Sequence, residues 1–238
     1  MTLPSSNSPQ PIVCRRSFRR IAHFAAALPH DLADSLWRDP ESLVGHGEQL
    51  RENAARCTVR IEWNGTPYVL KHSIEPTLRH AVRQLIRPSR AWTTWQFTHR
   101  LADAGVATPR PVACVENVWG QLRRDSYLMY PYMEGRTLRS IFVNEARQLP
   151  ELHARLWRQV HELWQQLLAL GVSLGDTNLG NFIVSPDGRL WLIDLDKSRF
   201  HRTASAAAPH QQRAWNQLLR SAKKCGALSA AAAENRAA

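Results

Sequence analysis

The chain has 238 residues, 44% of them hydrophobic and 21% charged, which is typical of a folded globular protein and not of a disordered one. No apolar run approaches the length needed to span a bilayer, and the first ten residues lack the charged start and apolar run of a signal peptide. The four cysteines lie far apart without CxxC pairing, so neither a disulfide framework nor a zinc site is indicated. We therefore expect a cytoplasmic protein with reduced thiols.

Basic residues outnumber acidic ones, with 31 Lys and Arg against 20 Asp and Glu and a formal net charge of +11. A charge of this sign attracts nucleic acid, anionic lipid or phosphorylated sugars. The sequence contains no zinc finger and no RNP-type strand, so no specific nucleic-acid partner is expected. The competing interpretation is that the arginine excess merely reflects a GC-rich genome.

The N-terminal region combines a polar start with a basic amphipathic stretch. Residues 1–10 are rich in Pro, Ser and Asn and are predicted to be disordered. Residues 15–27 are predicted either to form a helix packed on the neighbouring lobe or to lie on an anionic membrane surface. In the second case Phe18, Ile21 and Phe24 would be the apolar anchors.

A β-hairpin is predicted next. Residues 57–63 alternate between polar and apolar, Asn64-Gly65 is a strong two-residue turn signal, and residues 66–71 return. Lys71 ends the second strand, where a lysine is most often simply solvated. The preceding loop, residues 52–56, lacks the glycine pattern of a phosphate-covering loop.

Two helices are expected after this hairpin, one over residues 79–87 and one over residues 89–105. Ser89 is a suitable cap for the second helix, and Gly105 is a suitable end.

The remaining elements follow from apolar periodicity. Residues 109–115 and 126–133 are predicted strands. Leucines and a valine recur at helical spacing over residues 152–170, and Gly171 ends this predicted core helix. Residues 211–220 are predicted to form one more helix.

A second hairpin is predicted between residues 174 and 196. Two short apolar runs, residues 182–184 and 190–193, are joined by Ser185-Pro-Asp-Gly188. Proline fixes φ, aspartate hydrogen-bonds back to the backbone and glycine accepts a positive φ, so this linker is a turn. The two runs should therefore pair as antiparallel strands.

Polar side chains stand at the open ends of this hairpin. Asp176 and Asn181 come before the first strand, and Asp194 and Asp196 follow the second. Such a set suits phosphoryl transfer, because one carboxylate can accept a proton while an amide and a second carboxylate hold Mg²⁺. Asp176 precedes Asn181 by five positions, the spacing of the kinase catalytic loop. An ordinary hairpin with polar ends is the competing interpretation.

With these residues the chain resembles the protein-kinase-like fold, and more narrowly the bacterial lipopolysaccharide core kinases that phosphorylate heptose or Kdo. The matching positions are Gly175, Asp176, Asn181, Phe182, Asp187, Gly188, Ile193, Asp194 and Asp196. The stretch that begins Ser89-Arg-Ala-Trp also resembles a helix of that family. At Leu174 the family usually has histidine. The resemblance covers about residues 45–220.

The resemblance implies an α+β, two-lobed protein-kinase-like fold with a small antiparallel-sheet N-lobe and a compact, mainly helical C-lobe. The expected boundaries are an N-terminal extension, partly disordered, over 1–44, an N-lobe over 45–135, a C-lobe over 136–222 and a disordered tail over 223–238. Only 42 residues (238 − 196) follow Asp196, too few for the peptide-docking helices of a protein kinase.

The resemblance also implies roles for single residues. Asp176 is the expected catalytic residue that orients or deprotonates the acceptor hydroxyl. Asn181 and Asp194 are the expected Mg²⁺ ligands, with Asp196 as the fallback, and Lys71 is expected to hold the phosphates of ATP. The acceptor is expected to be a lipopolysaccharide core glycolipid, with peripheral contact to the anionic inner face of the inner membrane as a further expectation.

Two other functions stay open at this point. Leu174, the glycine-free loop and the absence of a glutamate for Lys71 on helix 89–105 favour a non-catalytic, pseudokinase-like binding module. Kinases of other small hydroxylated molecules, such as aminoglycoside-type or choline-type substrates, share the hairpin. The presence of all three groups that do the chemistry favours the sugar kinase.

Overall fold

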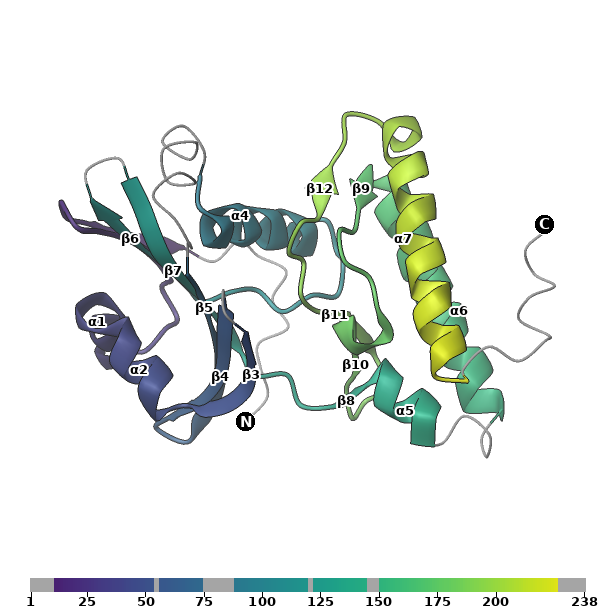
Figure 1. Cartoon of the computed structure of the whole chain (residues 1–238), viewed down its shortest axis with the longest axis horizontal. Coiled ribbons are helices and arrows are strands. Elements are labelled where there is room, and N and C mark those ends of the chain that lie inside the picture. The colour runs from purple at the N-terminus through teal and green to yellow at the C-terminus, as the bar shows by residue number, and fades with distance from the viewer. Residues whose placement is uncertain (1–10, 54–55, 75–87, 120–121, 145–149, 227–238) are drawn as a thin grey trace. The chain divides into compact units, whose positions relative to one another are not determined.

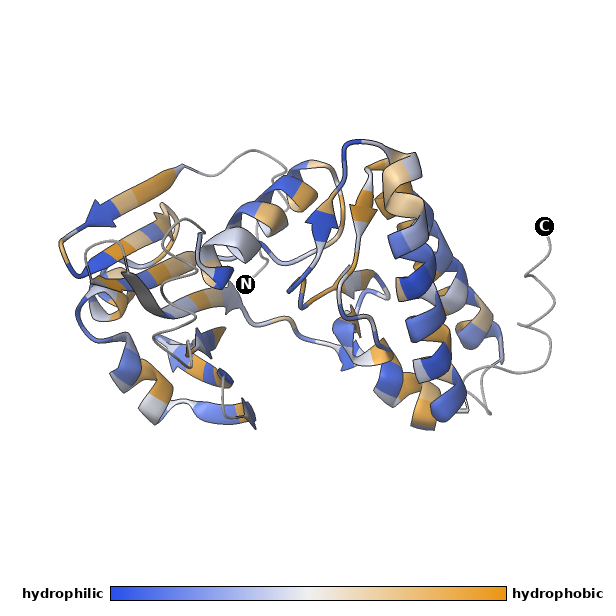
Figure 2. Cartoon of the chain, turned by 45° about the horizontal axis from the view of Figure 1, so that its top comes forward, coloured by the Kyte–Doolittle hydropathy of each residue, from blue (hydrophilic) through white to orange (hydrophobic). Residues whose placement is uncertain are grey.

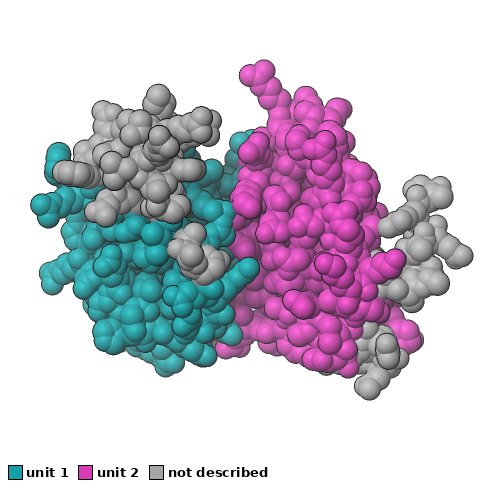
Figure 3. Space-filling model, in the orientation of Figure 1, with its two compact units in different colours: residues 1–103, 109–132 teal, residues 104–108, 133–238 magenta. Residues whose placement is uncertain are grey.

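The computed structural model describes residues 11–53, 56–74, 88–119, 122–144 and 150–226. They belong to two compact units, one of residues 1–103 and 109–132 and the other of residues 104–108 and 133–238 (Figures 1 and 3). The first unit is built on an antiparallel sheet and the second is mainly helical. The α+β, two-lobed class expected from the sequence is therefore confirmed.

Unit 1 contains a seven-stranded sheet in the order β1-β2-β6-β7-β5-β4-β3, antiparallel at every pairing. The strands are β1 (Ile12–Arg16), β2 (Arg20–Ala25), β3 (Glu48–Asn53), β4 (Arg56–Trp63), β5 (Thr66–Ser73), β6 (Ala113–Trp119) and β7 (Leu122–Pro131). Asn64 and Gly65, between β4 and β5, have φ values of 49° and 73°. Two left-handed residues in a row make the tight hairpin turn that Asn-Gly predicts.

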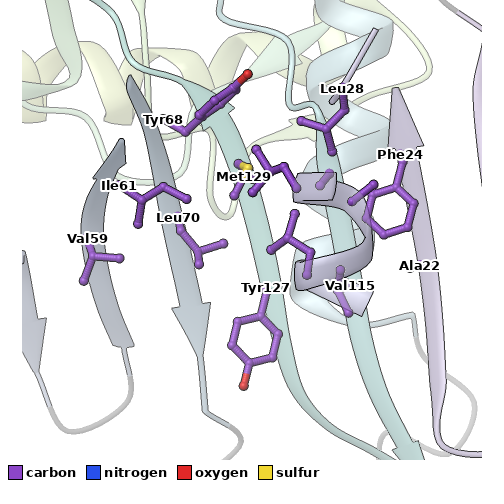
Figure 4. Close-up of a cluster of buried hydrophobic side chains, with 14 residues drawn as sticks. Ala22, Phe24, Leu28, Val59, Ile61, Tyr68, Leu70, Val115, Tyr127 and Met129 are labelled. Atoms are coloured by element: carbon purple, nitrogen blue, oxygen red, sulfur yellow. The ribbon is translucent and has the colours of Figure 1, made fainter. Parts of the chain in front are cut away.

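Helices cover both faces of this sheet. On one face, the helices α1 (His30–Arg38) and α2 (Pro40–His46) pack against the sheet and contribute to a core that includes Phe24, Leu70 and Met129 (Figure 4). On the other face α4 (Arg90–Asp103) packs Trp95 against β6 and β7. Each large apolar side chain buried in this way stabilises the unit by about 1.5–3 kcal/mol.

The N-terminal stretch corrects the prediction made for residues 15–27. It is neither a packed helix nor a surface helix but the hairpin β1–β2, and β2 pairs with β6. Ala22 and Phe24 are buried in the core, whereas Phe18, at the turn, is 72% exposed. The short stretch fits a period of two as well as a helical period, and pairing with β6 decides between them.

Helix α4 begins and ends as its sequence predicts. The Ser89 hydroxyl accepts a hydrogen bond from the N–H of Trp92 at 3.0 Å, and Gly105 follows the helix with a φ of 83°. The chain then enters unit 2 for residues 104–108 before returning to β6.

Unit 2 contains three helices among its described residues, α5 (Leu138–Asn144), α6 (Pro150–Ala169) and α7 (Ala204–Lys224). Its strands are β8 (Arg136–Thr137), β9 (Val172–Ser173), β10 (Phe182–Val184), β11 (Leu190–Leu192) and β12 (Arg199–Phe200), and the short helix η1 covers Leu179–Asn181. They form the sheets β11-β10-β8 and β12-β9. Along α6 and α7 hydrophobic and hydrophilic residues alternate (Figure 2), and Leu156, Val160 and Leu167 of α6 are fully buried.

Helix α7 is longer than the predicted 211–220. Thr203 caps it by accepting the N–H of Ala206 at 3.1 Å, and the helix continues through Pro209. The predicted helix began only at residue 211 because proline usually marks a helix boundary, whereas Pro209 lies inside the second turn of α7.

Several boundaries differ from the expected ones or fall outside the described residues. Residues 12–46 belong to unit 1 and contribute two of its strands, whereas we expected an extension before the lobe. The tail expected to be disordered from residue 223 begins later, because α7 continues to Lys224. The predicted helix 79–87, the centre of the loop 52–56 and the predicted disorder of residues 1–10 and of the rest of the tail, 227–238, lie outside the described residues.

Candidate active site

The predicted hairpin is present in unit 2 and is attached to helix α6. Strands β10 and β11 pair antiparallel, with Phe182 opposite Leu192. Gly188 closes the turn at a φ of 80°, and its N–H donates to the Ser185 carbonyl at 2.8 Å. Gln159 of α6 accepts the N–H of Leu190 and donates to the carbonyl of Gly188, each at 3.1 Å. The turn is therefore fixed to the core helix through its main chain.

Two loops at the open end of the hairpin are held side by side by strand pairing at both of their ends. The first loop, residues 174–181, runs from β9 to β10, and the second, residues 193–198, runs from β11 to β12. Strand β9 pairs with β12 and strand β10 pairs with β11 (Figure 1). Because both ends are paired, the polar residues of the two loops are confined to one region of unit 2.

The two loops also touch directly at Gly175. A Cβ placed on Gly175 would lie 2.4 Å from the Cβ and 2.5 Å from the carbonyl oxygen of Lys197. No other residue type fits at that distance, so the glycine allows the backbone of the first loop to approach the second. This contact fixes the position of the residue that follows, Asp176.

Asn181 joins the end of the first loop to its beginning. Asn178 caps the helix η1 by accepting the N–H of Gly180 at 2.8 Å, which sets the direction of the loop. The Asn181 side-chain N–H then donates to the main-chain carbonyl of Asp176 at 2.7 Å. From the described residues its Oδ1 accepts one hydrogen bond, from Asn178 at 3.1 Å, and an amide oxygen has two lone pairs. One lone pair of this oxygen is thus available to a ligand.

Helix α7 supports the loop from the other side. The Gln217 side chain donates to Oδ1 of Asp176 at 3.0 Å, and the hydroxyl of Ser221 accepts the N–H of Leu179 at 3.4 Å. The sequence does not predict this contact of Gln217. Nothing local signals it, since Gln217 lies 41 residues from the side chain that it contacts.

The second loop is joined to the first at Ile193, the residue before Asp194. The N–H of Ile193 donates to the carbonyl of Asn181 at 2.8 Å, which extends the β10–β11 pairing by one residue. Asp194 has a φ of 59°, in the left-handed region where residues other than glycine are uncommon. Such a conformation is found preferentially at functional sites, where the surroundings maintain it. Asp196, the fallback ligand, is half-buried two residues further on.

These residues provide the kind of oxygen ligands that Mg²⁺ prefers, one amide oxygen and the carboxylates of the second loop. Among the described residues no three His, Cys, Asp or Glu side chains gather into a complete metal site.

Lys71 lies in unit 1, near the end of β5. It pairs with Leu128, a residue of the α4-facing core, so it lies on the α4 face of the sheet. Its Nζ is 5.5 Å from the centre of the Tyr130 ring. Helix α4 carries no glutamate, and its one acid, Asp103, pairs with Arg110 at 2.6 Å.

Leu174, the position at which the family resembled usually has histidine, is 8% exposed. It follows β9, both of whose residues are buried, so an apolar side chain is accommodated there by packing.

Comparison with known proteins gives a consistent result. The model of the lipopolysaccharide kinase (Kdo/WaaP) family matches residues 34–235. A 3-deoxy-D-manno-octulosonic acid kinase of Vibrio cholerae serotype O1 is 27% identical over 173 residues, 67% of this chain and 68% of its own. The lipopolysaccharide core heptose(I) kinase WaaP of Escherichia coli K12 is 30% identical over 103 residues, 40% of this chain and 39% of its own.

A solved structure of WaaP in complex with acyl carrier protein covers 84% of this chain and 82% of that chain, with a TM-score of 0.64 and 24% sequence identity. It shows that the fold is shared. No helix among the described residues is long and apolar enough to cross a membrane. With the family model matching most of the chain, the protein belongs to the lipopolysaccharide kinase (Kdo/WaaP) family, whose members are phosphotransferases acting on sugar hydroxyl groups.

Proposed function

We propose that the protein transfers the γ-phosphoryl group of ATP to a hydroxyl of heptose or Kdo in the lipopolysaccharide inner core. The observation that carries this proposal is the pair of loops at the open end of the β10–β11 hairpin. They hold Asp176, Asn181 and Asp194 in one region through strand pairing and the Gly175–Lys197 contact.

Asp176 is the proposed catalytic residue. The donor that Gln217 supplies to Oδ1 of Asp176 leaves the second carboxylate oxygen to receive the proton of the acceptor hydroxyl. As that proton moves to Asp176, the hydroxyl oxygen bonds to the γ-phosphorus and the bond to the oxygen of ADP breaks. Because this chemistry depends mainly on positioning, the fixed loop is the main contribution of the protein.

Asn181 and Asp194 are the proposed Mg²⁺ ligands, with Asp196 as the alternative to Asp194. When bound, Mg²⁺ neutralises charge on the phosphate oxygens. The hydrogen bond from Asn181 to Asp176 fixes the orientation of its amide, and the left-handed φ of Asp194 supports choosing it over Asp196. Lys71 of β5 is proposed to bind the nucleotide phosphates.

Family membership favours this function over the two alternatives left open by the sequence. A kinase of aminoglycoside-type or choline-type substrates would belong to another family. A non-catalytic module is disfavoured because specific hydrogen bonds hold Asp176 and Asn181 in the loop. These hydrogen bonds are present although Leu174 stands where the family usually has histidine.

The test is phosphoryl transfer from radiolabelled ATP to purified core oligosaccharide in the presence of Mg²⁺. Asp176→Asn keeps an oxygen for the Gln217 hydrogen bond, so we expect unchanged stability and nucleotide affinity. Transfer should fall by about 10²–10⁴, the usual contribution of a positioned general base. Asp187→Asn, the same change in the exposed hairpin turn, is the matched control and should transfer at the wild-type rate. A wild-type protein that binds Mg·ATP and transfers nothing would refute the proposal.

The turn of hairpin β1–β2 is our proposal for contact with the anionic inner face of the membrane, where a cytoplasmic enzyme would meet its glycolipid. Phe18 is 72% exposed there, and Arg16 and Arg19 beside it are exposed as well. An aromatic side chain between cations is suited to an anionic lipid surface. The contact predicted at the sequence level through Phe24 is excluded, because that side chain is in the core.

Sedimentation with anionic vesicles tests this contact. Phe18→Ser should weaken binding, and binding should decrease between low and physiological salt because surface charges are screened. Val143→Ser removes an apolar side chain that is 57% exposed in unit 2 and should have no effect. Equal binding of both variants at every salt concentration would exclude the hairpin turn as the contact.

A further inference from the structure

A basic cavity of about 450 Å³ lies beside the first loop of unit 2. Its size is within the range of small-molecule sites, about 300–1,000 Å³. Three segments form its walls: the chain from the end of β9 into the first loop, the chain from the second loop into β12, and one face of α7. The lining residues are Ser173, Leu174, Gly175, Lys197, Arg199, His210, Arg213, Ala214, Gln217 and Arg220.

Four of the lining residues carry a permanent positive charge, and none of the lining residues is acidic. The cations are Lys197, Arg199, Arg213 and Arg220. Within the part of the chain that the structure describes, none of the four is paired with a carboxylate. Like charges gathered around one cavity repel each other, and a bound anion would relieve that repulsion. The cavity is therefore suited to an oxyanion.

The face of α7 that lines the cavity is a regular stripe. His210, Arg213, Gln217 and Arg220 follow one another at spacings of three, four and three residues, which places them on one side of the helix. Arg213 and Arg220 are exposed to solvent, so their guanidinium groups are accessible to a ligand.

The opposite wall is held by specific contacts. Ser173 Oγ lies 2.8 Å from Nε2 of His201, and the His201 ring stacks on His210 with 4.9 Å between centres. The pairing of Arg199 with Ser173 fixes the backbone of the strand side. The backbone of this wall is thus held in place before any ligand arrives, which reduces the entropic cost of binding.

The cavity adjoins the proposed catalytic residue. Gln217 lines the cavity and donates to the carboxylate of Asp176, and Gly175, the residue before Asp176, also lines it. Asn181, by contrast, binds the main-chain carbonyl of Asp176 and does not line the cavity. A ligand in the cavity would therefore reach Asp176 from the carboxylate side, which is where an acceptor hydroxyl must be.

We propose that this cavity binds an anionic group of the acceptor, a carboxylate or a phosphate on the phosphorylated sugar or its neighbour, and so presents the hydroxyl to Asp176. This inference rests on the proposed function. The guanidinium groups of Arg213 and Arg220 can each donate two parallel hydrogen bonds to two oxygens of a carboxylate or a phosphate, and Lys197 adds a further positive charge. A neutral sugar would leave the four cations without a partner and is expected to be a poor acceptor.

Arg213→Gln, Arg220→Gln and the double variant test the inference in the full-length protein. Both side chains are exposed, so the variants should fold as the wild type does. Arg158→Gln, the same substitution at an exposed position of α6 outside the cavity, is the matched control.

In the transfer assay we expect the KM for core oligosaccharide to rise about ten- to hundredfold in each single variant, the effect of losing one charge-assisted hydrogen bond. The KM for ATP should stay unchanged, and Arg158→Gln should match the wild type in both constants. An unchanged acceptor KM in the double variant would overturn the inference while leaving the proposed kinase activity intact. A rise in the KM for ATP instead would assign the cavity to the nucleotide and overturn it as well.

Direct binding separates the two sources of the anion and does not depend on turnover. Calorimetry without ATP would compare free Kdo, which carries a carboxylate, with glucose phosphate and with a neutral methyl glycoside. Binding of either anionic probe, lost in the double variant, supports the inference and identifies carboxylate or phosphate as the group recognised. If the wild type transfers nothing, the proposed function fails, and this binding result still decides the inference: absence of binding to both anionic probes overturns it.

Discussion

Gly175→Ala tests whether the contact between the two loops positions Asp176. The added Cβ would lie 2.4 Å from the Lys197 Cβ and 2.6 Å from its carbonyl carbon, whereas ordinary contact begins at 3.4 Å. The loops must therefore separate by about 1 Å (3.4 − 2.4), because backbone atoms cannot swing away as the end of a flexible side chain can.

Two magnitudes follow from that displacement. Overpacking of this kind destabilises a protein by about 1–3 kcal/mol, and each kcal/mol lowers the melting temperature of a domain of about 100 residues by about 4–8 °C. A misplacement of about 1 Å in the reacting geometry costs about 10² in rate. We therefore expect kcat to fall about a hundredfold in a protein that still folds at 25 °C.

The assay is phosphoryl transfer to core oligosaccharide, with thermal unfolding measured on the same samples. Gly188→Ala is the matched control, because Gly188 has a φ of 80° and its added Cβ would meet Arg155 only at 3.5 Å. Left-handed backbone costs an alanine about 1–2 kcal/mol, so this variant should be destabilised to a similar degree and remain active. The reasoning is refuted if Gly175→Ala keeps wild-type kcat, or if Gly188→Ala loses as much activity.

Three further predictions concern the metal, a helix and pH. Asp194→Asn should abolish Mg²⁺-dependent ATP binding in calorimetry, because it removes a charged ligand of a hard cation; if Asp196→Asn loses binding instead, the two assignments must be exchanged. Gly45→Ala should raise the free energy of unfolding, measured in urea, by about 0.5–1 kcal/mol, because Gly45 lies within α2 and nothing lies within 4 Å of the added Cβ. An unchanged or lower free energy of unfolding would contradict this prediction. Burial lowers the pKa of His72 and of His99 below the usual 6.5, so just below that pH the unfolded state binds more protons than the folded state. The free energy of unfolding should therefore decrease as the pH falls through that window, and a flat profile between about pH 7.5 and 5.5 would contradict it.

Much of the fold and part of the site were predictable because their signals are local. The Asn64-Gly65 turn, the cap at Ser89 and the Pro-Asp-Gly turn each depend on a few consecutive residues, and all three form as predicted. The spacing of Asp176 and Asn181 places both in one loop, where a single side-chain hydrogen bond joins them. Their roles in catalysis and in metal binding stay predictions.

The N-terminal hairpin was not predictable, because its conformation depends on a strand far away in the sequence. Residues 12–25 are too few to distinguish a period of two from a helical period, and their partner, β6, begins 88 residues after β2 ends (113 − 25). Pairing with an existing sheet edge satisfies the backbone of β2, and that long-range gain decides the conformation.

The hairpin, its turn and the order of the polar residues follow from local sequence, because they depend on backbone preferences within a few residues. The surroundings of Asp176, by contrast, depend on long-range packing. The Gln217 contact, the approach of Lys197 to Gly175 and the cavity lining join residues that are 22 to 47 positions apart (197 − 175 and 220 − 173). Such contacts arise when α7 and the strand pairs β9–β12 and β10–β11 pack together, and no local pattern encodes which side chains then meet.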